Sequence, residues 1–431
     1  MEKRYKSYDP TQSLLFPPNI KDWLPEDHLA YFVDDVVDQL DLSEIEAVYE
    51  KDTRGQPPYN PRMMTKVLLY GYCTGIFSSR RIQKALIEEV PFRVLAAGNQ
   101  PDFRTISDFR KIHHKALQAL FEQVLEMALK AGAMTLGRVA LDGSKIKANA
   151  SKHKAMSYGR MKEKESQLRK EVRALLKEAD KIDSREDKLY GRNRRGDELP
   201  EELRHRETRL AKIREAKHAL EEEAREKAKA EGKDPEIAKP AEKDQRNFTD
   251  SESRIMKGSE GFVQACNAQA AVEESFQLIV GQSITQDAND KKQVEPMVEI
   301  IEAQSGQKPE QLLADSGYCS EQNLDYLVNK GIDGYVATER KKHGRPVEKC
   351  KPGPLPPNTS LVDRMKRKLQ TKSGAEIYAA RKSIVEPVFG QIKQGRGFRQ
   401  FLLRGLEKVK AEWALVCLTH NILKMYRICY G

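Results

Sequence analysis

Three acidic residues occupy similar positions in the sequence. Asp142 is the last residue of the apolar segment VALD and precedes Gly143. Asp315 is the last residue of LLAD and precedes Ser316 and Gly317. Glu386 lies in SIVEPVFGQIK, where Pro387 restricts it to the N-terminal edge of a helix or to a kink within a longer one. Because α/β sheets place their ligands at the C-terminal ends of strands, the pattern predicts that two of these carboxylates meet at one edge of a sheet.

Three converging carboxylates would suit one kind of chemistry. Their oxygens are the ligands that Mg²⁺ and Mn²⁺ prefer. Two such ions, about 3.5–4 Å apart, assist an in-line displacement at phosphorus, one activating the attacking oxygen and the other stabilising the leaving oxygen. Singly, each acid has an ordinary alternative, since Asp before Gly commonly forms a turn and Glu commonly begins a helix. The three residues therefore indicate phosphoryl transfer only as a set.

The N-terminal third of the chain has the periodicity of helices. An amphipathic helix is predicted from about Glu26, and PPYNP at 57–61 ends it. Helices are then expected over 61–74 and 78–90, with Gly75 in the turn between them. A third is expected from Thr105, where T-x-x-D resembles a capping box, through to Gly132. We therefore expect an all-α N-terminal domain at residues 1–132.

From residue 137 the pattern becomes that of an α/β domain, expected at residues 133–431. GRVALDGSKIKAN predicts a strand pair, and residues 262–285 and 311–318 predict further strands, with helices between and after them. A densely charged stretch at 155–245 has leucines and alanines at helical spacing, which indicates a helical hairpin inserted into this domain. The expected fold is a mixed sheet flanked by helices.

Composition narrows the partners and the compartment. The 431 residues carry a formal net charge of +10, which suits a polyanionic partner but is common among other proteins too. The six cysteines include no CxxC pair, so we expect reduced thiols and neither a disulfide framework nor a zinc site. With no signal peptide and no apolar run of about 20 residues, the chain is expected to be cytoplasmic and without a membrane partner.

Several blocks of the sequence resemble bacterial insertion-sequence transposases of the DDE type. LDGSKIKANASKHK, LLADSGYCSEQNL and YAARKSIVEPVFGQIKQGRGFRQFLLRG are similar to the three catalytic blocks of this family, and PPYNPRMMTKVLLYGY and PDFRTISDFRKIHHKAL to its N-terminal part. The resemblance implies an RNase H-like core in which Asp142, Asp315 and Glu386 are the catalytic triad and bind two Mg²⁺ or Mn²⁺ ions. It also implies action on double-stranded DNA, at terminal inverted repeats and target DNA, by a homodimer or larger assembly.

Basic residues near Glu386 are candidates for binding DNA. Many relatives carry Tyr, two residues, Arg, three residues, Glu, six residues and Lys. Lys393 fits this motif, whereas Lys382 stands at the Arg position and Arg381 beside it; the tyrosine is likewise one residue early. Cations here suit DNA phosphates, but for Arg381 and Lys382 a solvated or ion-paired role is equally open.

The N-terminal helices and the insertion each allow two interpretations. Helices 61–74 and 78–90 have helix-turn-helix dimensions, which would place Arg80 and Arg81 at the start of a recognition helix. The alternative is ordinary helix packing with two surface arginines. The sequence of the insertion alone predicts a solvated helical hairpin. The family resemblance implies in addition that the hairpin contacts transposon ends or a second subunit. A DNA-binding regulator without catalysis and a metal-dependent nuclease without joining activity remain alternative functions.

Overall fold

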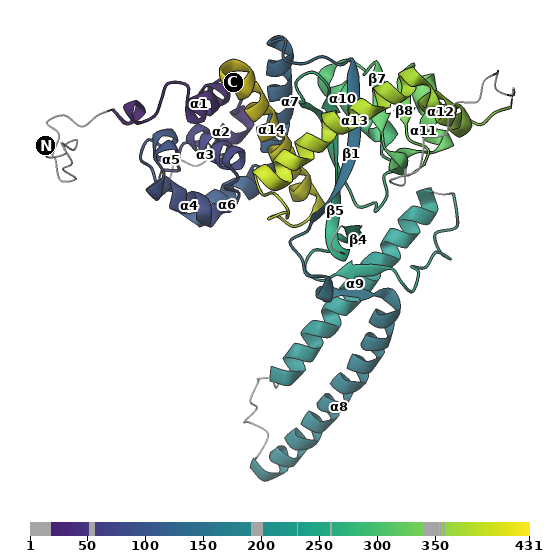
Figure 1. The fold of residues 1–431 in the computed structure, drawn as a ribbon. Coiled ribbons are helices and arrows are strands. Elements are labelled where there is room, and N and C mark those ends of the chain that lie inside the picture. The colour runs from purple at the N-terminus through teal and green to yellow at the C-terminus, as the bar shows by residue number, and fades with distance from the viewer. Residues whose placement is uncertain are drawn as a thin grey trace, which may run out of the picture.

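The computed structural model describes residues 19–50, 57–190, 201–230, 232–258, 261–339, 353, 356 and 358–431. Within these residues the chain forms a group of N-terminal helices, an α/β body and a long helical arm that projects from the body (Figure 1). The first part of the N-terminal segment, residues 1–18, lies outside the described residues. No helix in the described part of the chain combines the length and apolar character needed to cross a membrane.

The N-terminal helices form largely where the sequence predicts them. Asn60 caps α3 by accepting hydrogen bonds from the backbone N–H groups of Arg62 and Met63, and Pro61 occupies the first turn, where its missing N–H costs nothing. Gly75 ends α3 in the left-handed conformation. The helices are α1 (Leu29–Gln39), α2 (Ser43–Glu46), α3 (Pro61–Thr74), α4 (Ser79–Glu88), α5 (Val90–Leu95), α6 (Phe103–Ile112) and α7 (His114–Lys130).

The prediction of one helix from near Thr105 to Gly132 is wrong in its N-cap and in its continuity. The cap is Asp102, whose carboxylate accepts hydrogen bonds from the N–H groups of Arg104 and Thr105, so the helix begins two residues earlier. The segment is also two helices, because the backbone leaves the helical conformation at His113. The buried imidazole of His113 lies 2.8 Å from the Tyr49 hydroxyl, a distant contact that the local sequence does not reveal.

The body contains a six-stranded mixed sheet with the hydrogen-bonded order β4-β5-β1-β7-β8, in which β6 also pairs with β5. β1 runs antiparallel to β5 and parallel to β7, β7 is parallel to β8, and β4 and β6 are antiparallel to β5. The strands are β1 (Arg138–Lys147), β4 (Arg254–Gly258), β5 (Gly261–Glu273), β6 (Ile279–Thr285), β7 (Gln311–Ala314) and β8 (Asp333–Val336).

A single long strand replaces the strand pair predicted at residues 137–149. The ladder between β1 and β5 runs without interruption through Asp142, opposite Ala270, and Gly143, opposite Gln269. Gly143 is therefore not a turn residue. A Cβ atom at this position would lie 2.4 Å from Gln269 Nε2 and 2.8 Å from Asp290 Oδ1, so any larger residue would have to displace these side chains.

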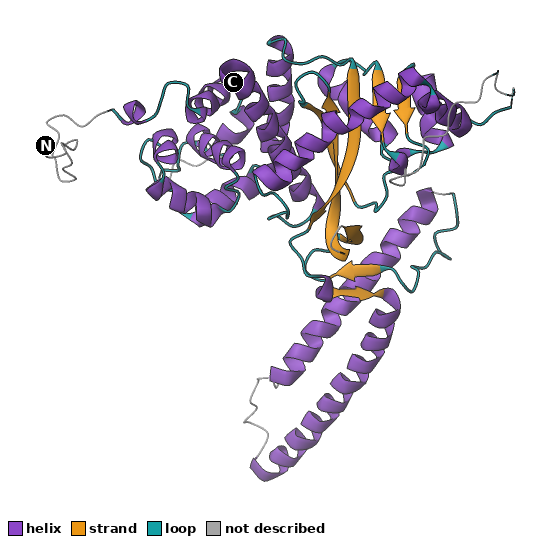
Figure 2. Cartoon of the chain, viewed as in Figure 1, coloured by secondary structure: helices purple, strands orange, loops and turns teal. Residues whose placement is uncertain are grey.

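Helices cover the sheet and connect it to the N-terminal helices (Figure 2). α14 packs on β6, α7 and α3, so the last helix of the chain joins the two parts. α13 continues through Pro387, which places Glu386 inside a long helix, the second of the two predicted possibilities. A π-helical turn, Gln391–Gly395, follows it. The helices are α10 (Val294–Ser305), α11 (Glu321–Asn329), α12 (Leu361–Gln370), α13 (Lys372–Gly390) and α14 (Leu406–Tyr430).

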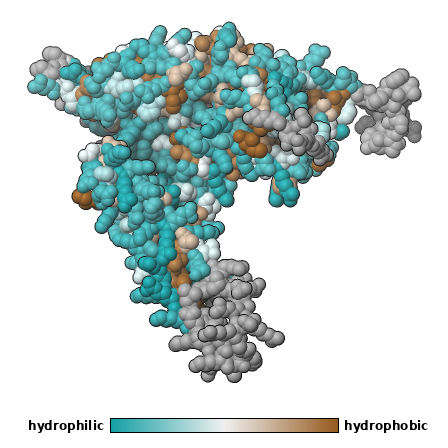
Figure 3. Space-filling view, turned by 180° about the vertical axis from the view of Figure 1, so that it is seen from behind, coloured by the Kyte–Doolittle hydropathy of each residue, from teal (hydrophilic) through white to brown (hydrophobic). Residues whose placement is uncertain are grey.

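The segment predicted as a helical hairpin forms the arm. Its helices α8 (Tyr158–Tyr190) and α9 (Glu201–Ala230) emerge from a two-stranded sheet of β2 (Ala155–Ser157) and β3 (Gln245–Asn247). Residues 191–200, between the helices, lie outside the described residues. The two helices share a separate small core. The visible face of body and arm is mostly hydrophilic, with scattered apolar patches, as the high charge content of the sequence requires (Figure 3).

We expect Gly75→Ala to destabilise the protein by about 2–4 kcal/mol, because it combines left-handed strain with overpacking. Gly75 has a φ of 81°, and a Cβ atom there would lie 2.6 Å from the carbonyl oxygen of Arg396. Gly98 is a matched control, since its φ is 77° but no atom lies within 4 Å of an added Cβ. Gly98→Ala should cost about 1–2 kcal/mol from backbone strain. Urea unfolding measures both losses, and equal losses would contradict the close packing of the α3–α4 turn against Arg396.

Candidate active site

Asp142 and Asp315 lie where two parallel strands separate. The pairing between β1 and β7 ends at Ala140 and Leu313, after which β1 continues alone beside β5. Asp315 directly follows β7, as predicted. Asp142, however, lies inside β1 and not at its end, which corrects the prediction. Both carboxylates still lie at the same end of the parallel pair. β1 continues beyond the end of its pairing with β7, and over this stretch it remains paired with β5.

Local hydrogen bonds orient both carboxylates. Asp315 caps the 3₁₀ turn Ser316–Tyr318, and its Oδ1 accepts a hydrogen bond from the N–H of Gly317 at 2.8 Å. Asp142 Oδ1 accepts one from the N–H of Gly143, also at 2.8 Å. The other oxygen of Asp315 has no hydrogen bond to a described residue, whereas Asp142 Oδ2 is ion-paired with Arg381.

Arg381 brings Glu386 to the same place. From α13, its Nη1 lies 3.6 Å from Asp142 Oδ2, and its Nη2 lies 3.9 Å from Glu386 Oε1. The Arg381 side chain is only 11% exposed, whereas that of Glu386 is 55% exposed. Arg381 also interacts electrostatically with Asp315 and with the Tyr378 hydroxyl. The three acids predicted from the sequence are therefore grouped around one buried guanidinium group.

The environment of Asp142 disfavours its ionised form. Burial raises the pKa of Asp142 to about 6; Arg381 opposes this shift, and the neighbouring Asp315 and Asp290 carboxylates add to it. One arginine thus does not balance the carboxylates around it. A bound cation would relieve both the burial and the repulsion.

Asp290 is a fourth carboxylate that sequence reasoning missed. Asn267 Nδ2 and Gln269 Nε2 each donate a hydrogen bond to Asp290 Oδ1 at 2.7 Å, and Lys145 Nζ lies 3.3 Å from Oδ2. A signal was present in β5, where Asn267 and Gln269 alternate with alanines in a buried strand and so place two amides on one face. Asp290 itself lies in the charged loop before α10, which gives no local sign of burial.

The predicted basic residues divide into those at the site and those away from it. Lys393 Nζ donates a hydrogen bond to Ser144 Oγ, two residues from Asp142 on β1. Burial lowers the pKa of Lys393, and the Asp142 carboxylate opposes this effect. Lys382 is exposed, and no contact joins it to the acids in the described part of the chain. The arginine at the site is thus Arg381, which lies one residue before the position that the family motif predicts.

Arg80 and Arg81 lie in the first turn of α4, on the N-terminal part of the molecule. Both are exposed, and the Arg80 guanidinium stacks on the Phe103 ring at 4.8 Å. The α3–α4 pair has the predicted lengths and turn, but α4 packs mainly on α6 and α5. The role of the two arginines in DNA recognition stays a prediction.

The chemistry of the donors fits a hard divalent cation. Asp142, Asp315 and Glu386 supply carboxylate oxygens, the type of ligand that Mg²⁺ and Mn²⁺ prefer, and a bound cation would oppose the rise in the pKa of Asp142 that burial causes. Among the residues that the structure describes, no group of three or more His, Cys, Asp or Glu side chains is arranged as a ready-made metal site. The Arg381 guanidinium group lies between Asp142 and Glu386, where a metal ion would otherwise bind.

Comparison with known protein families gives two matches. Residues 18–112 match the family model described as a transposase domain (DUF772), and residues 223–422 match that described as a transposase DDE domain. The second range includes Asp315, Glu386, Arg381 and Lys393, whereas Asp142 lies outside both. No curated protein and no solved structure matches the chain.

Proposed function

The chain belongs to the DDE transposases of the insertion-sequence type, which have an RNase H-like fold, and we propose that it cleaves transposon ends and joins the freed 3′-hydroxyl to target DNA at one site. Asp142, Asp315 and Glu386 are the proposed catalytic residues. The observation that carries this proposal is the grouping of these acids around Arg381, although they come from three distant parts of the sequence.

The family generally uses divalent metal ions. Asp142, Asp315 and Glu386 would hold two Mg²⁺ or Mn²⁺ ions, which when bound activate the attacking oxygen and stabilise the leaving oxygen. Both proposed reactions exchange one P–O bond for another. In cleavage, water attacks and the 3′-oxygen leaves; in joining, the 3′-hydroxyl attacks target DNA and another 3′-oxygen leaves. Neither reaction needs a covalent bond to the protein.

The residues around the acids have separate proposed tasks. Lys393, held by Ser144 next to Asp142, is placed to bind a phosphate oxygen. Arg381 opposes the effect of burial, which raises the pKa of Asp142 and so disfavours its ionised form. Because phosphate is itself anionic, these two cations would lower the repulsion between DNA and the acids. Arg80 and Arg81 are proposed to contact the inverted repeats, and two ends held together would require a homodimer or larger assembly.

Product analysis tests the proposed function. The full chain is incubated with Mg²⁺ and duplex DNA that carries the inverted repeats flanking its reading frame, and the strands are resolved on a denaturing gel. Joined strands support the proposal, whereas free ends without joining identify a nuclease. A protein that retards the DNA but never nicks it, in Mg²⁺ or Mn²⁺, is a DNA-binding regulator. Chelation with EDTA should stop nicking and leave binding in place.

Arg381→Gln is expected to lower kcat/KM for end cleavage by about 100- to 1,000-fold, the usual cost of losing one preorganised charge-stabilising donor. Lys382→Gln should change it by no more than a few fold, because Lys382 points into solvent. The pair of variants removes the same charge from adjacent residues of α13. A larger loss for Lys382→Gln would mean that the family motif, and not the observed contact with Asp142, identifies the functional cation.

A further inference from the structure

One side of α8 carries cations that the proposed catalytic chemistry does not use. Lys162, Arg169, Arg173 and Lys177 are all exposed. Because a helix turns by about 100° per residue, these positions fall within roughly 80° of one another around the axis. At about 1.5 Å per residue they extend roughly 22 Å along it. We call these four residues, with Lys170 at their flank, the cation row.

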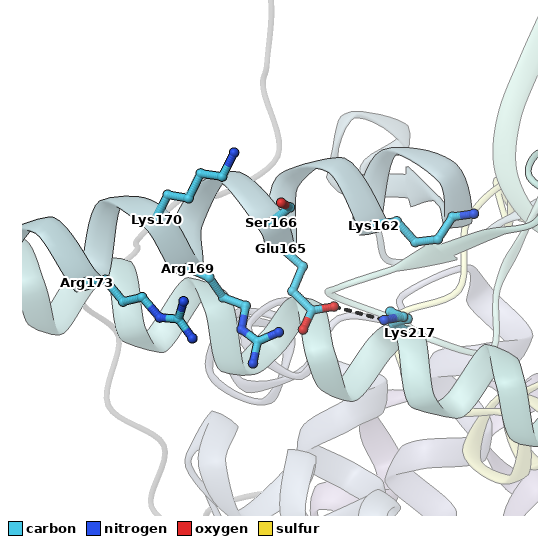
Figure 4. Close-up of a pocket in the computed structure, with 7 residues that line it drawn as sticks. All are labelled: Lys162, Glu165, Ser166, Arg169, Lys170, Arg173 and Lys217. Carbon is cyan, nitrogen blue, oxygen red and sulfur yellow. Dashed lines mark hydrogen bonds and ion pairs between the residues drawn. The ribbon is translucent and has the colours of Figure 1, made fainter.

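The cation row lies beside the contact between the arm helices, since the hollow that it lines also includes Lys217 of α9. Met161, Leu168 and Val172 of α8 are buried against α9 and define that contact. Beside the row lies a hollow of about 330 Å³, lined by Lys162, Glu165, Ser166, Arg169, Lys170, Arg173 and Lys217. Arg169 and Arg173 leave α8 toward the same side of this hollow (Figure 4). The residues of the lining are thus polar or charged, and most of them are basic.

The positive charge of this surface is only partly neutralised within the described part of the chain, where Lys162 pairs with Glu242. Glu165, the one acid in the lining, is already bound to Lys217 at 2.9 Å and to Arg214 at 3.2 Å. Arg169, Lys170 and Arg173 make no hydrogen bond or ion pair with any residue that the structure describes. Residues 158–177 contain seven Lys or Arg but three Asp or Glu. Three neighbouring cations therefore remain available to an external anion.

We propose that the cation row binds the phosphate backbone of duplex DNA away from the active site, an inference that rests on the proposed function. Duplex DNA carries one negative charge per about 1.7 Å of its axis, so a row of roughly 22 Å spans many phosphates. Long, flexible cations that contact phosphates hold DNA in position without reading its sequence. Since the arm projects from the body (Figure 1), this contact would involve DNA beyond the segment held by the acids.

The test removes these three cations together, as Arg169→Gln/Lys170→Gln/Arg173→Gln in the full chain. Binding to a 60-base-pair duplex of random sequence is measured in EDTA at several NaCl concentrations. Each phosphate contact contributes about 0.9 to the slope of log K against log salt, so the slope should become shallower by about 2–3. The matched control, Arg225→Gln/Lys227→Gln/Lys229→Gln, removes the same charge from exposed positions of α9 and should leave the slope nearly unchanged.

Three results would overturn the inference. The first is a wild-type slope in the α8 variant, and the second is an equal decrease in the α9 control, which would show a general charge effect. The third is altered self-association of the α8 variant with an unchanged slope, which would identify an acidic protein surface as the partner. Circular dichroism confirms that both variants keep their helix content. If the wild-type chain binds no duplex at all, the proposed function fails instead.

Discussion

Asp142→Asn is expected to reduce DNA cleavage and joining by on the order of 1,000-fold or more, equivalent to about 4 kcal/mol of transition-state stabilisation. The amide keeps the shape of the side chain but removes the charge that would hold a divalent ion. Because cleavage and joining are proposed to use the same acids, both should fall together. Asp315→Asn should have a comparable effect, and single-turnover assays in Mg²⁺ measure both variants.

The same substitution should not weaken the fold. The pKa of Asp142 is raised to about 6 in the folded chain, above its ordinary value of 3.8, so the folded state binds this proton more tightly than the unfolded chain. At a pH above 6 the ionised carboxylate therefore opposes folding. In EDTA at pH 8, Asp142→Asn should leave the Tm unchanged or raise it.

A control at another strand strengthens the comparison. Asp333→Asn changes an exposed acid at the start of β8, which pairs with Lys368 at the surface. It should keep nearly wild-type activity. Comparable inactivation by Asp333→Asn, or full activity of Asp142→Asn, would contradict the assignment of the active site.

Glu412→Ala is expected to lower the free energy of unfolding by about 3–5 kcal/mol, because it leaves a buried cation without its counter-ion. The Glu412 side chain is fully buried, and its Oε1 lies 3.9 Å from Arg110 Nη1 and 3.3 Å from the Tyr72 hydroxyl. Its Oε2 accepts hydrogen bonds from the N–H groups of Leu402 and Leu403, both at 2.9 Å. Glu412 thus connects α14 with α3, with α6 and with the loop that precedes α14.

Glu407→Ala is the matched control for this loss. Glu407 lies on the same helix but is exposed, and its pair with Lys410 is a surface interaction. Its removal should change the free energy of unfolding by less than about 1 kcal/mol. Chemical denaturation followed by circular dichroism compares the two variants. Similar small losses would mean that the network around Glu412 does not hold the N-terminal helices to the body.

The sequence predicted the class of fold because its strongest patterns are local. The helices α3 and α4, the strands at residues 262–285 and the charged arm all follow from periodicity, caps and turn residues. The errors occur where contacts between residues that are far apart in the sequence determine the local structure. The helix breaks at His113, whose side chain contacts the distant Tyr49. The continuity of β1 through Gly143 depends on β5, whose Gln269 needs the space that a side chain would fill.

The candidate site could be predicted only in part for the same reason. Asp142, Asp315 and Glu386 were identified from strand patterns and family resemblance, and the structure groups them. Asp290 was missed, because its burial is produced by Asn267, Gln269 and Lys145, which come from other segments. The choice between Arg381 and Lys382 also required the structure, since the direction of each side chain depends on how α13 lies against β1.

The central claim is that Asp142, Asp315 and Glu386 together bind divalent metal. Anomalous diffraction at the manganese edge tests it most directly, on crystals of the full chain with end DNA and Mn²⁺. We predict manganese density in direct contact with the carboxylates of Asp142 and Asp315, with Glu386 as a further ligand and Arg381 displaced from between the acids. Manganese bound elsewhere, with Asp142 and Asp315 uncoordinated, would contradict the account.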